Sequence, residues 1–435
     1  MPLRLDARAP DFETAFQALV DGDRETQSDV SDAARAIIDQ VVAGGDAALY
    51  ALTERFDRFD PTATGLAITE AEIDAAVARV PAETRTALEL AAARIEAFHT
   101  RQLPDDIQYT DDQGVRLGLR WTPIDAAGLY VPGGTAAYPS SVLMNAIPAR
   151  VAGVNRRVMV VPTPDGVVND LVLAAARLSG VTEIWRIGGA QAVAALAHGT
   201  ESIRPVDKIV GPGNAYVAAA KRLVFGKVGI DSIAGPSEIL VVADGRNNPS
   251  WIAIDLLSQA EHDTAAQAIL ITDDANFADA VTAAVDDHLT TLPRTEIAAE
   301  SWRVHGAVIV VERLDDAPGL VDRLAPEHLE LAVDDPDAMA GKIRHAGAMF
   351  LGRHAPEAVG DYVAGPNHVL PTMRTARFSS GLGVLDFMKR TTLVGCSADS
   401  LARIGPAAIT LAEAEGLDAH ARSIAVRLNS RPEIG

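Results

Sequence analysis

The sequence predicts an α/β protein with largely parallel sheets, preceded by a helical N-terminal region and followed by a helical C-terminal tail. Three features lead to this prediction. From about residue 120, short β-rich runs alternate with alanine-rich helical runs, which is typical of parallel strands joined by helices. Residues 1–110 are alanine-rich with interspersed acidic and basic residues, as on solvent-facing helices. The last 55 residues, 381–435, also have a helical pattern.

Within the N-terminal region, Ser31 is the expected cap of a helix over AARAIIDQVV, and residues 70–80 form a second short helix. Pro104 and the polar run 105–114 predict a boundary. This region shows no constellation of catalytic residue types.

The central part contains the predicted strands and helices of the sheets. The strands are expected over 158–161, 183–187, 208–210, 239–242, 268–272, 308–311 and 328–333. Helices are expected over 190–198, 215–224 and 251–262, the last with Ser250 as its cap.

In the tail, Pro406 marks an expected helix start and Gly416 a stop, and Asp418 then caps a final helix that carries His420. So short a tail has little core of its own. It must therefore pack on its own body or on a partner chain.

Composition excludes several classes of protein. The net charge of −21 disfavours nucleic acid and anionic membranes as partners. No segment approaches the ~18 consecutive apolar residues of a membrane span, and MPLRLDARAP lacks a signal-peptide core. The single cysteine, Cys396, agrees with a reducing compartment, so a cytoplasmic location is expected. No histidine or lysine adjoins Cys396, which favours a buried or neutral structural thiol over a nucleophile.

Two glycine-rich turns each follow a predicted strand and precede a helix. They are GGAQ at 188–191 and GPGN at 211–214. Both place free backbone N–H groups at a helix N-terminus, which suits phosphate. Neither is a complete GxGxxG, because Tyr216 stands where the third glycine of the second turn belongs. Dinucleotide binding and tight chain reversal both remain possible. A third loop, 130–135, fits a plain proline–glycine turn.

Four segments carry residues suited to metal binding or acid–base chemistry. In LLSQAEH, Gln259 and His262 lie three residues apart on one helix face, although a structural histidine is the simpler interpretation. In APEHLE, Glu327 and His328 suit general acid–base work. Successive strand residues point to opposite faces, so this pair can share a site only where the strand begins.

The other two segments are DYVAGPNHVLP, with Asp361 in a loop-like run, and EGLDAH, with Glu415 and His420 at a helix break. Incidental charges at a helix end would also explain the second. Together Gln259, His262, Asp361 and His420 offer two oxygen and two nitrogen donors, which suit zinc or a similar divalent metal. No CxxC or HExxH spacing supports the set.

In this order the segments resemble histidinol dehydrogenase. The matching stretches run from about 120 to 425 and are TPIDAAGLYVPGGTAAYPSSVLMNAIPARVAGV, IGGAQAVAALAHGT, KIVGPGNAYVAAAKR, GPSEIL, DLLSQAEHD, APEHLEL, DYVAGPNHVLPT, ARFSSGL, DFMKRTT and AEAEGLDAHARS.

The resemblance implies a set of functional residues. The implied zinc ligands are Gln259, His262, Asp361 and His420. The implied catalytic acid–base pair is Glu327 and His328. The implied NAD contacts are Tyr130, Gln191 and Asn214. The implied substrate contacts are Ser237, Gln259, His262, His328, Asp361, Glu415 and His420.

The resemblance also implies an architecture and a reaction. It implies two incomplete Rossmann-like domains, one from 111–128 and 237–380 with the zinc and catalytic residues, and one from 129–236 on the NAD side. The tail 381–435 would swap onto the partner in a homodimer with shared active sites. The implied reaction uses one Zn²⁺ per subunit and two NAD⁺ to oxidise L-histidinol through L-histidinal to L-histidine.

Three alternatives stay open. Relatives that oxidise a sulfonated diol differ around the glycine-rich loop and the GPSE motif, and both read as the histidinol type here. A zinc hydrolase with Glu327 activating a metal-bound water would leave the glycine-rich turns unexplained. A non-catalytic metal-binding or assembly protein would have no use for both Glu327 and His328. Turnover with NAD⁺ distinguishes them.

Overall fold

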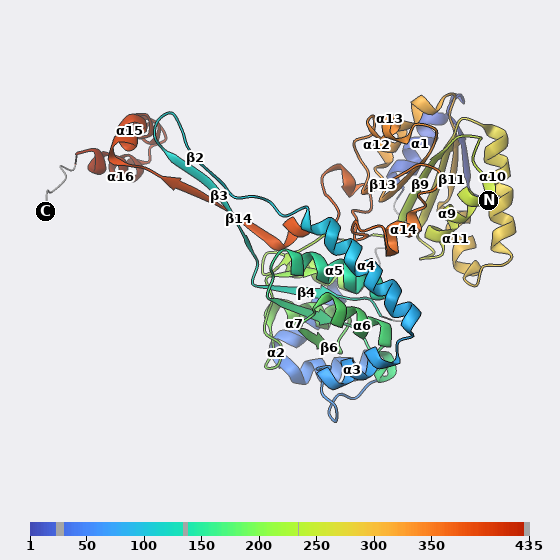
Figure 1. The fold of residues 1–435 in the computed structure, drawn as a ribbon, viewed down its shortest axis with the longest axis horizontal. Coiled ribbons are helices and arrows are strands. Elements are labelled where there is room, and N and C mark those ends of the chain that lie inside the picture. Colours follow the sequence, from blue (N-terminus) through green and yellow to red (C-terminus); the bar gives the residue numbers. More distant parts are fainter. Residues whose placement is uncertain (23–29, 134–137, 234, 430–435) are drawn as a thin grey trace.

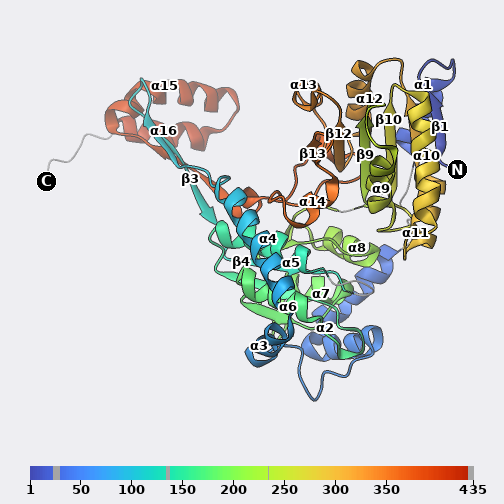
Figure 2. The same cartoon turned by 45° about the vertical axis from the view of Figure 1, so that its right-hand side comes forward.

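The structure is a computed structural model that describes residues 1–22, 30–133, 138–233 and 235–429. It has three parts: two α/β domains built on parallel sheets, and an arm that projects from them (Figures 1 and 2). The prediction of an α/β protein with parallel sheets is confirmed. Among the described helices, none is long and apolar enough to cross a membrane.

The first domain is built on a five-stranded parallel sheet in the order β6-β5-β4-β7-β8. Numbered along the chain, this order is 3-2-1-4-5, so the connections change direction between β4 and β7. Helices α3 to α6 cover one face, and α2, α7 and α8 cover the other. The elements are β4 Ala126–Tyr130, β5 Arg156–Val160, β6 Glu183–Trp185, β7 Lys208–Val210, β8 Gly229–Ile230, α2 Val30–Asp57, α3 Glu70–Arg79, α4 Ala82–Thr100, α5 Pro139–Val151, α6 Asp170–Ser179, α7 Gly189–His198 and α8 Ala215–Val224.

The second domain is built on a six-stranded parallel sheet in the order β1-β11-β10-β9-β12-β13. Its central strand β9, EILVVA, is buried at every residue because helices cover both faces. Helices α9, α10 and α11 pack on one face, and α1, α12 and α13 on the other. The elements are β1 Leu3–Asp6, β9 Glu238–Ala243, β10 Gln267–Thr272, β11 Ala307–Val310, β12 His328–Ala332, β13 Ala348–Leu351, α1 Phe12–Asp21, α9 Pro249–Ala260, α10 Ala275–Leu289, α11 Thr295–His305, α12 Ala317–Leu324, α13 Pro336–Ala340 and α14 Glu357–Tyr362.

The arm is a three-stranded antiparallel ribbon, in the order β14-β3-β2, that ends in two helices. Both views show it extending away from the α/β domains, with the C-terminal helices at its far end (Figures 1 and 2). Large apolar side chains on it are exposed, among them Val394 and Leu411. The elements are β2 Ile107–Thr110, β3 Arg116–Pro123, β14 Met388–Gly395, α15 Ala398–Ala414 and α16 Asp418–Asn429.

The structure differs from the expected domain boundaries in three places. Residues 111–128, expected with the catalytic pair, instead supply β3 of the arm and most of β4, which pairs in parallel with β5 and β7. The N-terminal region is not wholly helical, because β1 pairs with β11 at the edge of the six-stranded sheet. The tail 381–435 is not wholly helical either, since it contains β14.

Three expected helix ends are also wrong. Pro406 lies inside α15, which starts earlier at Ser397, whose Oγ accepts a hydrogen bond from Ser400 N. Asn248, not Ser250, caps α9 by accepting from Ser250 N. The helix expected to begin after Ser31 already includes it, because α2 starts at Val30.

Candidate functional site

A cleft of about 1470 Å³ lies between the carboxyl ends of β4 and β7 and the amino ends of β9 and β12. The first wall therefore belongs to the five-stranded sheet and the second to the six-stranded sheet. Predicted site residues from both walls line it, namely Tyr130, Gln191, Asn214, Ser237, Gln259, His262, Glu327, His328 and Asp361.

Glu327 and His328 lie where the chain enters β12, which is the place predicted for two adjacent residues that share one site. Ala325 ends α12 in the left-handed region, with φ 46°, and this lets the chain turn into the strand. Glu327 Oε2 accepts a hydrogen bond from Glu238 N at 2.9 Å, and Glu327 N donates to Glu238 Oε2 at 3.2 Å. These reciprocal bonds fix the backbone ahead of His328 against the start of β9.

The His328 ring is held in one orientation by a backbone carbonyl. Its Nδ1 lies 2.9 Å from Glu238 O. A carbonyl oxygen can only accept, so Nδ1 carries the proton and Nε2 keeps a free lone pair. Burial lowers the pKa of His328 to about 4, against the opposing effects of the Asp361 charge and the Glu238 carbonyl. The ring is therefore neutral near pH 7 and can act as a base through Nε2.

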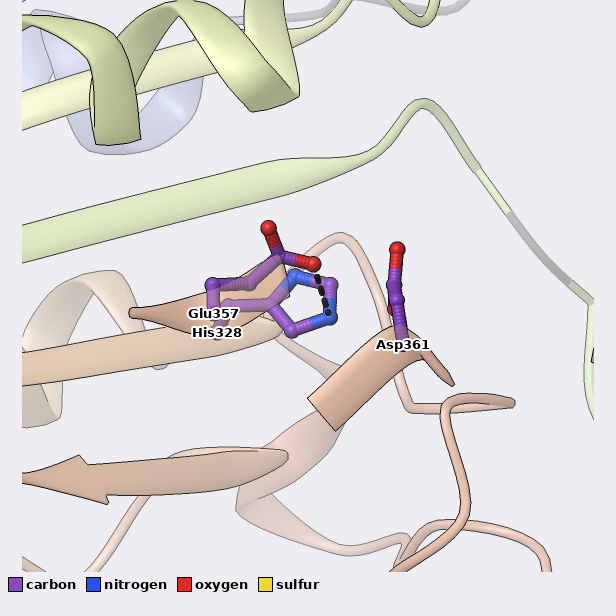
Figure 3. A group of neighbouring side chains, drawn as sticks. All are labelled: His328, Glu357 and Asp361. Atoms are coloured by element: carbon purple, nitrogen blue, oxygen red, sulfur yellow. Dashed lines mark ion pairs between the residues drawn. The ribbon is translucent and has the colours of Figure 1, made fainter. Parts of the chain in front are cut away.

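Carboxyl groups crowd around this imidazole. Burial raises the pKa of Glu327 well above its ordinary value, and the nearby acids Glu238, Asp361 and Glu357 raise it further. Glu357 Oε1 lies 3.7 Å from His328 Nε2 (Figure 3). Burial, and then the Asp361 charge, raises the pKa of Glu357 to about 9.

Asp361 is the ionised member of this group. Burial acts to raise its pKa, but the hydrogen bond with His368 and the neighbouring imidazoles outweigh burial and lower it. Ligand atoms of His328, Glu357 and Asp361 lie within 4.8 Å of one another, as in a cation site. Both acids stand on α14, four residues apart and hence on one face (Figure 3).

Gln259 and His262 lie at the carboxyl end of α9, on the same side of the cleft. Gln259 is 1% exposed, and its Oε1 has no hydrogen-bond partner among the described residues. Glu357 Oε1 is also buried without a hydrogen-bond partner among them. His262 Nδ1 lies 2.9 Å from Ser258 O, which orients the ring. Buried oxygens without partners are costly unless a ligand satisfies them. These donors therefore fit a divalent metal ion such as zinc.

The opposite wall carries the glycine-rich turns. Tyr130 Oη accepts a hydrogen bond from Gly189 N at 3.0 Å, which ties β4 to the start of α7. Asn214 caps α8 by accepting from Val217 N at 3.2 Å. Gln191 is buried in the first turn of α7. Residues 134–135 of the third loop lie outside the described residues.

A buried ion pair supports the second turn. Lys221 and Asp231 are 3% and 5% exposed, and they form a salt bridge. Lys221 Nζ also donates to Gly211 O at 3.0 Å, and Asp231 Oδ2 accepts from Gly211 N at 2.7 Å. Both backbone groups of Gly211 are therefore fixed by side chains.

Glu415 and His420 are not brought to this cleft within one chain. Both are exposed at the end of the arm, where α15 and α16 pack on each other. Cys396, expected to be buried or neutral structural, is exposed at the base of α15, because the ribbon offers little to cover it.

Several contributors to the site were missed from the sequence. Glu357 was detectable only from its spacing of four residues before Asp361. His368, which follows Asp361 in the segment DYVAGPNHVLP and was assigned no role, contacts Asp361 O through Nδ1 at 3.2 Å. Glu238 and the Lys221–Asp231 pair gave no signal, because their partners are distant in sequence or are backbone atoms.

Comparison with known proteins identifies the family to which the chain belongs. The profile of the family described as histidinol dehydrogenase matches residues 21–428. The histidinol dehydrogenase of Rhodospirillum rubrum is 68% identical over 430 residues, covering 99% of both chains. That of Bradyrhizobium diazoefficiens is 64% identical over 429 residues, covering 99% of this chain and all of the relative. The crystal structure of histidinol dehydrogenase from Elizabethkingia anophelis superposes with a TM-score of 0.94 at 36% identity, covering 98% of both chains. The chain therefore belongs to the histidinol dehydrogenase family, oxidoreductases of histidine biosynthesis.

Proposed function

We propose that this chain is a zinc-dependent enzyme that oxidises L-histidinol through L-histidinal to L-histidine, using two NAD⁺. The observation that carries the proposal is the state of His328. Its Nδ1 proton is held by the Glu238 carbonyl, and burial keeps the ring neutral, so Nε2 is a free base. That base faces buried donor groups and stands across the cleft from two glycine-rich turns.

Gln259, His262 and Asp361 would hold the zinc ion together with His420 from a second copy of the chain. When bound, zinc supplies a fixed positive centre that orients the imidazole and amino nitrogens of histidinol, and NAD⁺ accepts the two electrons of each oxidation. Ser237, and Glu415 from the second copy, contact the substrate in this proposal. Tyr130, Gln191 and Asn214 contact the dinucleotide.

In each oxidation, His328 Nε2 takes the proton of the substrate hydroxyl group as a general base. Between the two steps the aldehyde must be hydrated, and Glu327 activates the water. This role needs an ionised Glu327, whose pKa burial raises. A divalent cation held by the neighbouring donors would favour the ionised form of Glu327 and so its role with water.

The arm supports a shared active site. Glu415 and His420 are exposed beyond reach of their own cleft, and α15 and α16 make few contacts with the body. The exposed apolar side chains of the arm also favour burial against another surface. A homodimer in which each arm completes the partner's cleft satisfies both observations.

The deciding measurement is the amount of NADH formed per L-histidinol consumed, with and without a zinc chelator. Two NADH per substrate, lost with chelator and restored by zinc, are expected. One NADH would mean that the aldehyde escapes or is not oxidised. No NADH from histidinol would refute the proposal, and a panel with a sulfonated diol and hydrolysable esters would then test the alternatives.

A further inference from the structure

After the second strand of the first sheet, no acidic residue of the described segment 161–165 faces the cleft, although this is the usual place of the acid that binds the adenosine ribose. In Rossmann-like sheets an Asp or Glu after the second strand accepts hydrogen bonds from the ribose hydroxyl groups. Here β5 is the second strand, and VPTPD follows it. The acid of that segment, Asp165, is turned outward, with 62% of its side chain exposed, in a salt bridge with Arg58. It does not line the cleft.

A carboxylate from elsewhere in the chain reaches this place. Asp57, the last residue of α2, is 6% exposed and lines the cleft. Its Oδ2 accepts a hydrogen bond from Thr163 N at 3.1 Å, directly after β5. Asp57 is thus fixed at the end of the second strand, although it is 106 residues distant in sequence.

The surroundings of Asp57 include the first glycine-rich turn, at 188–191. Pro162, next to Thr163, packs so tightly on Gly188 that a Cβ there would lie 2.4 Å from it. Gly189 N donates to Tyr130 Oη, and the Asp57 charge adds to the effect of burial in raising the pKa of Tyr130 to about 12. The ends of β4, β5 and β6 therefore converge beside this carboxylate.

We propose that Asp57 binds the adenosine ribose hydroxyl groups of the dinucleotide and selects NAD⁺ over NADP⁺. This inference rests on the proposed function. Thr163 N occupies one carboxylate oxygen, which leaves the other for the vicinal diol. A 2′-phosphate at the same place would meet a negative charge. Arg55, which lines the same stretch of cleft, would pair with that phosphate once the charge of Asp57 is removed.

The test is the substitution Asp57→Asn, whose amide oxygen can still accept from Thr163 N. We expect NADH binding, measured by fluorescence without substrate, to weaken about ten-fold, because a charge-assisted hydrogen bond is lost. We also expect the ratio of kcat/KM for NADP⁺ to that for NAD⁺ to rise at least as much, with KM for histidinol unchanged. Asp165→Asn is the matched control and should leave all three quantities unchanged.

A cofactor analogue separates ribose recognition from a structural role. The dinucleotide that lacks the adenosine 2′-hydroxyl group should bind the parent more weakly than the normal dinucleotide does. The Asp57→Asn variant should bind the two dinucleotides with nearly equal affinity. Equal losses of affinity for this analogue in the parent and in Asp57→Asn would overturn the role of Asp57 while the proposed function stands. An unchanged ratio of kcat/KM for NADP⁺ to that for NAD⁺ in Asp57→Asn would do the same. If the parent bound neither NADH nor NADPH, the proposed function would fail, and this inference with it.

Discussion

Glu330 lies on β12, two residues after His328, and its buried carboxyl group contacts two neighbours. The residue is 3% exposed, and Oε1 accepts a hydrogen bond from Glu357 N at 2.5 Å at the start of α14. Its side chain also hydrogen-bonds with Asp255 of α9. Burial, and then the Asp255 charge, raises the pKa of Glu330 to about 8. At neutral pH the folded chain therefore holds a proton that the unfolded chain releases.

We expect Glu330→Gln to reduce the pH dependence of the free energy of unfolding by the share of this one group, while the shares of Glu327 and Glu357, whose pKa values are also raised, remain. A carboxyl group with a raised folded pKa contributes stability that is complete below its unfolded value and is lost as pH rises through its folded value. The loss is about 1.4 kcal/mol for each pH unit. From about pH 5 to about pH 8 this amounts to roughly 4 kcal/mol. Glutamine keeps the acceptor for Glu357 N but cannot ionise, so this loss disappears.

The assay is urea unfolding at several pH values across that window, followed by tryptophan fluorescence. Trp302, buried in the core of the same domain, reports on its unfolding. Glu296→Gln, on the exposed surface of α11, is the matched control and should follow the parent. If the parent and Glu330→Gln lost stability equally steeply with rising pH, Glu330 would not hold a proton in the folded chain and the reasoning would be refuted.

Three further outcomes concern the cleft and the arm. Replacing His328 by Asn should slow both oxidations about 10²–10⁴-fold, whereas Glu327→Gln should slow mainly the oxidation of the aldehyde. Stopped-flow NADH formation from histidinol and from histidinal measures the two oxidations separately. Equal slowing of both by Glu327→Gln would contradict the separate roles of the two residues. Mixed dimers of His262→Ala and His420→Ala chains should retain one working site of two, and complete inactivity would exclude the swapped arm. Cys396→Ala should keep full turnover, since this exposed thiol lies outside the cleft; a folded but inactive variant would restore it as a candidate nucleophile.

The buried parallel strands were predictable because they are short apolar runs that alternate with alanine-rich helical runs. The strand at 208–210 and the helix at 215–224 coincide with β7 and α8 residue for residue. Both belong to a unit whose local pattern and burial agree. The edge strand β1 was missed because four residues show too little alternation to stand out.

The ribbon of the arm could not be predicted, because its pattern matches neither a buried strand nor an amphipathic one. β14 reads MKRTTLVG and is largely exposed, yet it pairs with β3 over eight residues. Its stability comes from backbone pairing rather than from burial within its own chain. The helix start predicted at Pro406 was wrong because a proline is common in the first turn of a helix, whereas Pro406 lies within α15.

Within the candidate site, the sequence indicated the residues with recognisable chemistry, and the structure brings all of them except Glu415 and His420 to one cleft within the chain. It could not indicate groups whose role depends on distant contacts. Asp57 reaches the end of β5 only because α2 folds over that edge of the sheet. Glu330 looks like an ordinary strand residue until the packing of α9 and α14 shows that its carboxyl group is enclosed.

The two walls of the cleft also differ in the helix ends that they present. α7 and α8 begin at one wall, whereas α9 ends at the other with Gln259 and His262. A helix carries roughly half a positive charge at its start and half a negative charge at its end. The helix ends therefore favour negative groups close to one wall and positive groups close to the other, within about a turn of each helix end. In the proposed reaction, the electrons would pass toward the wall at which α7 and α8 begin, a direction that these helix ends would favour.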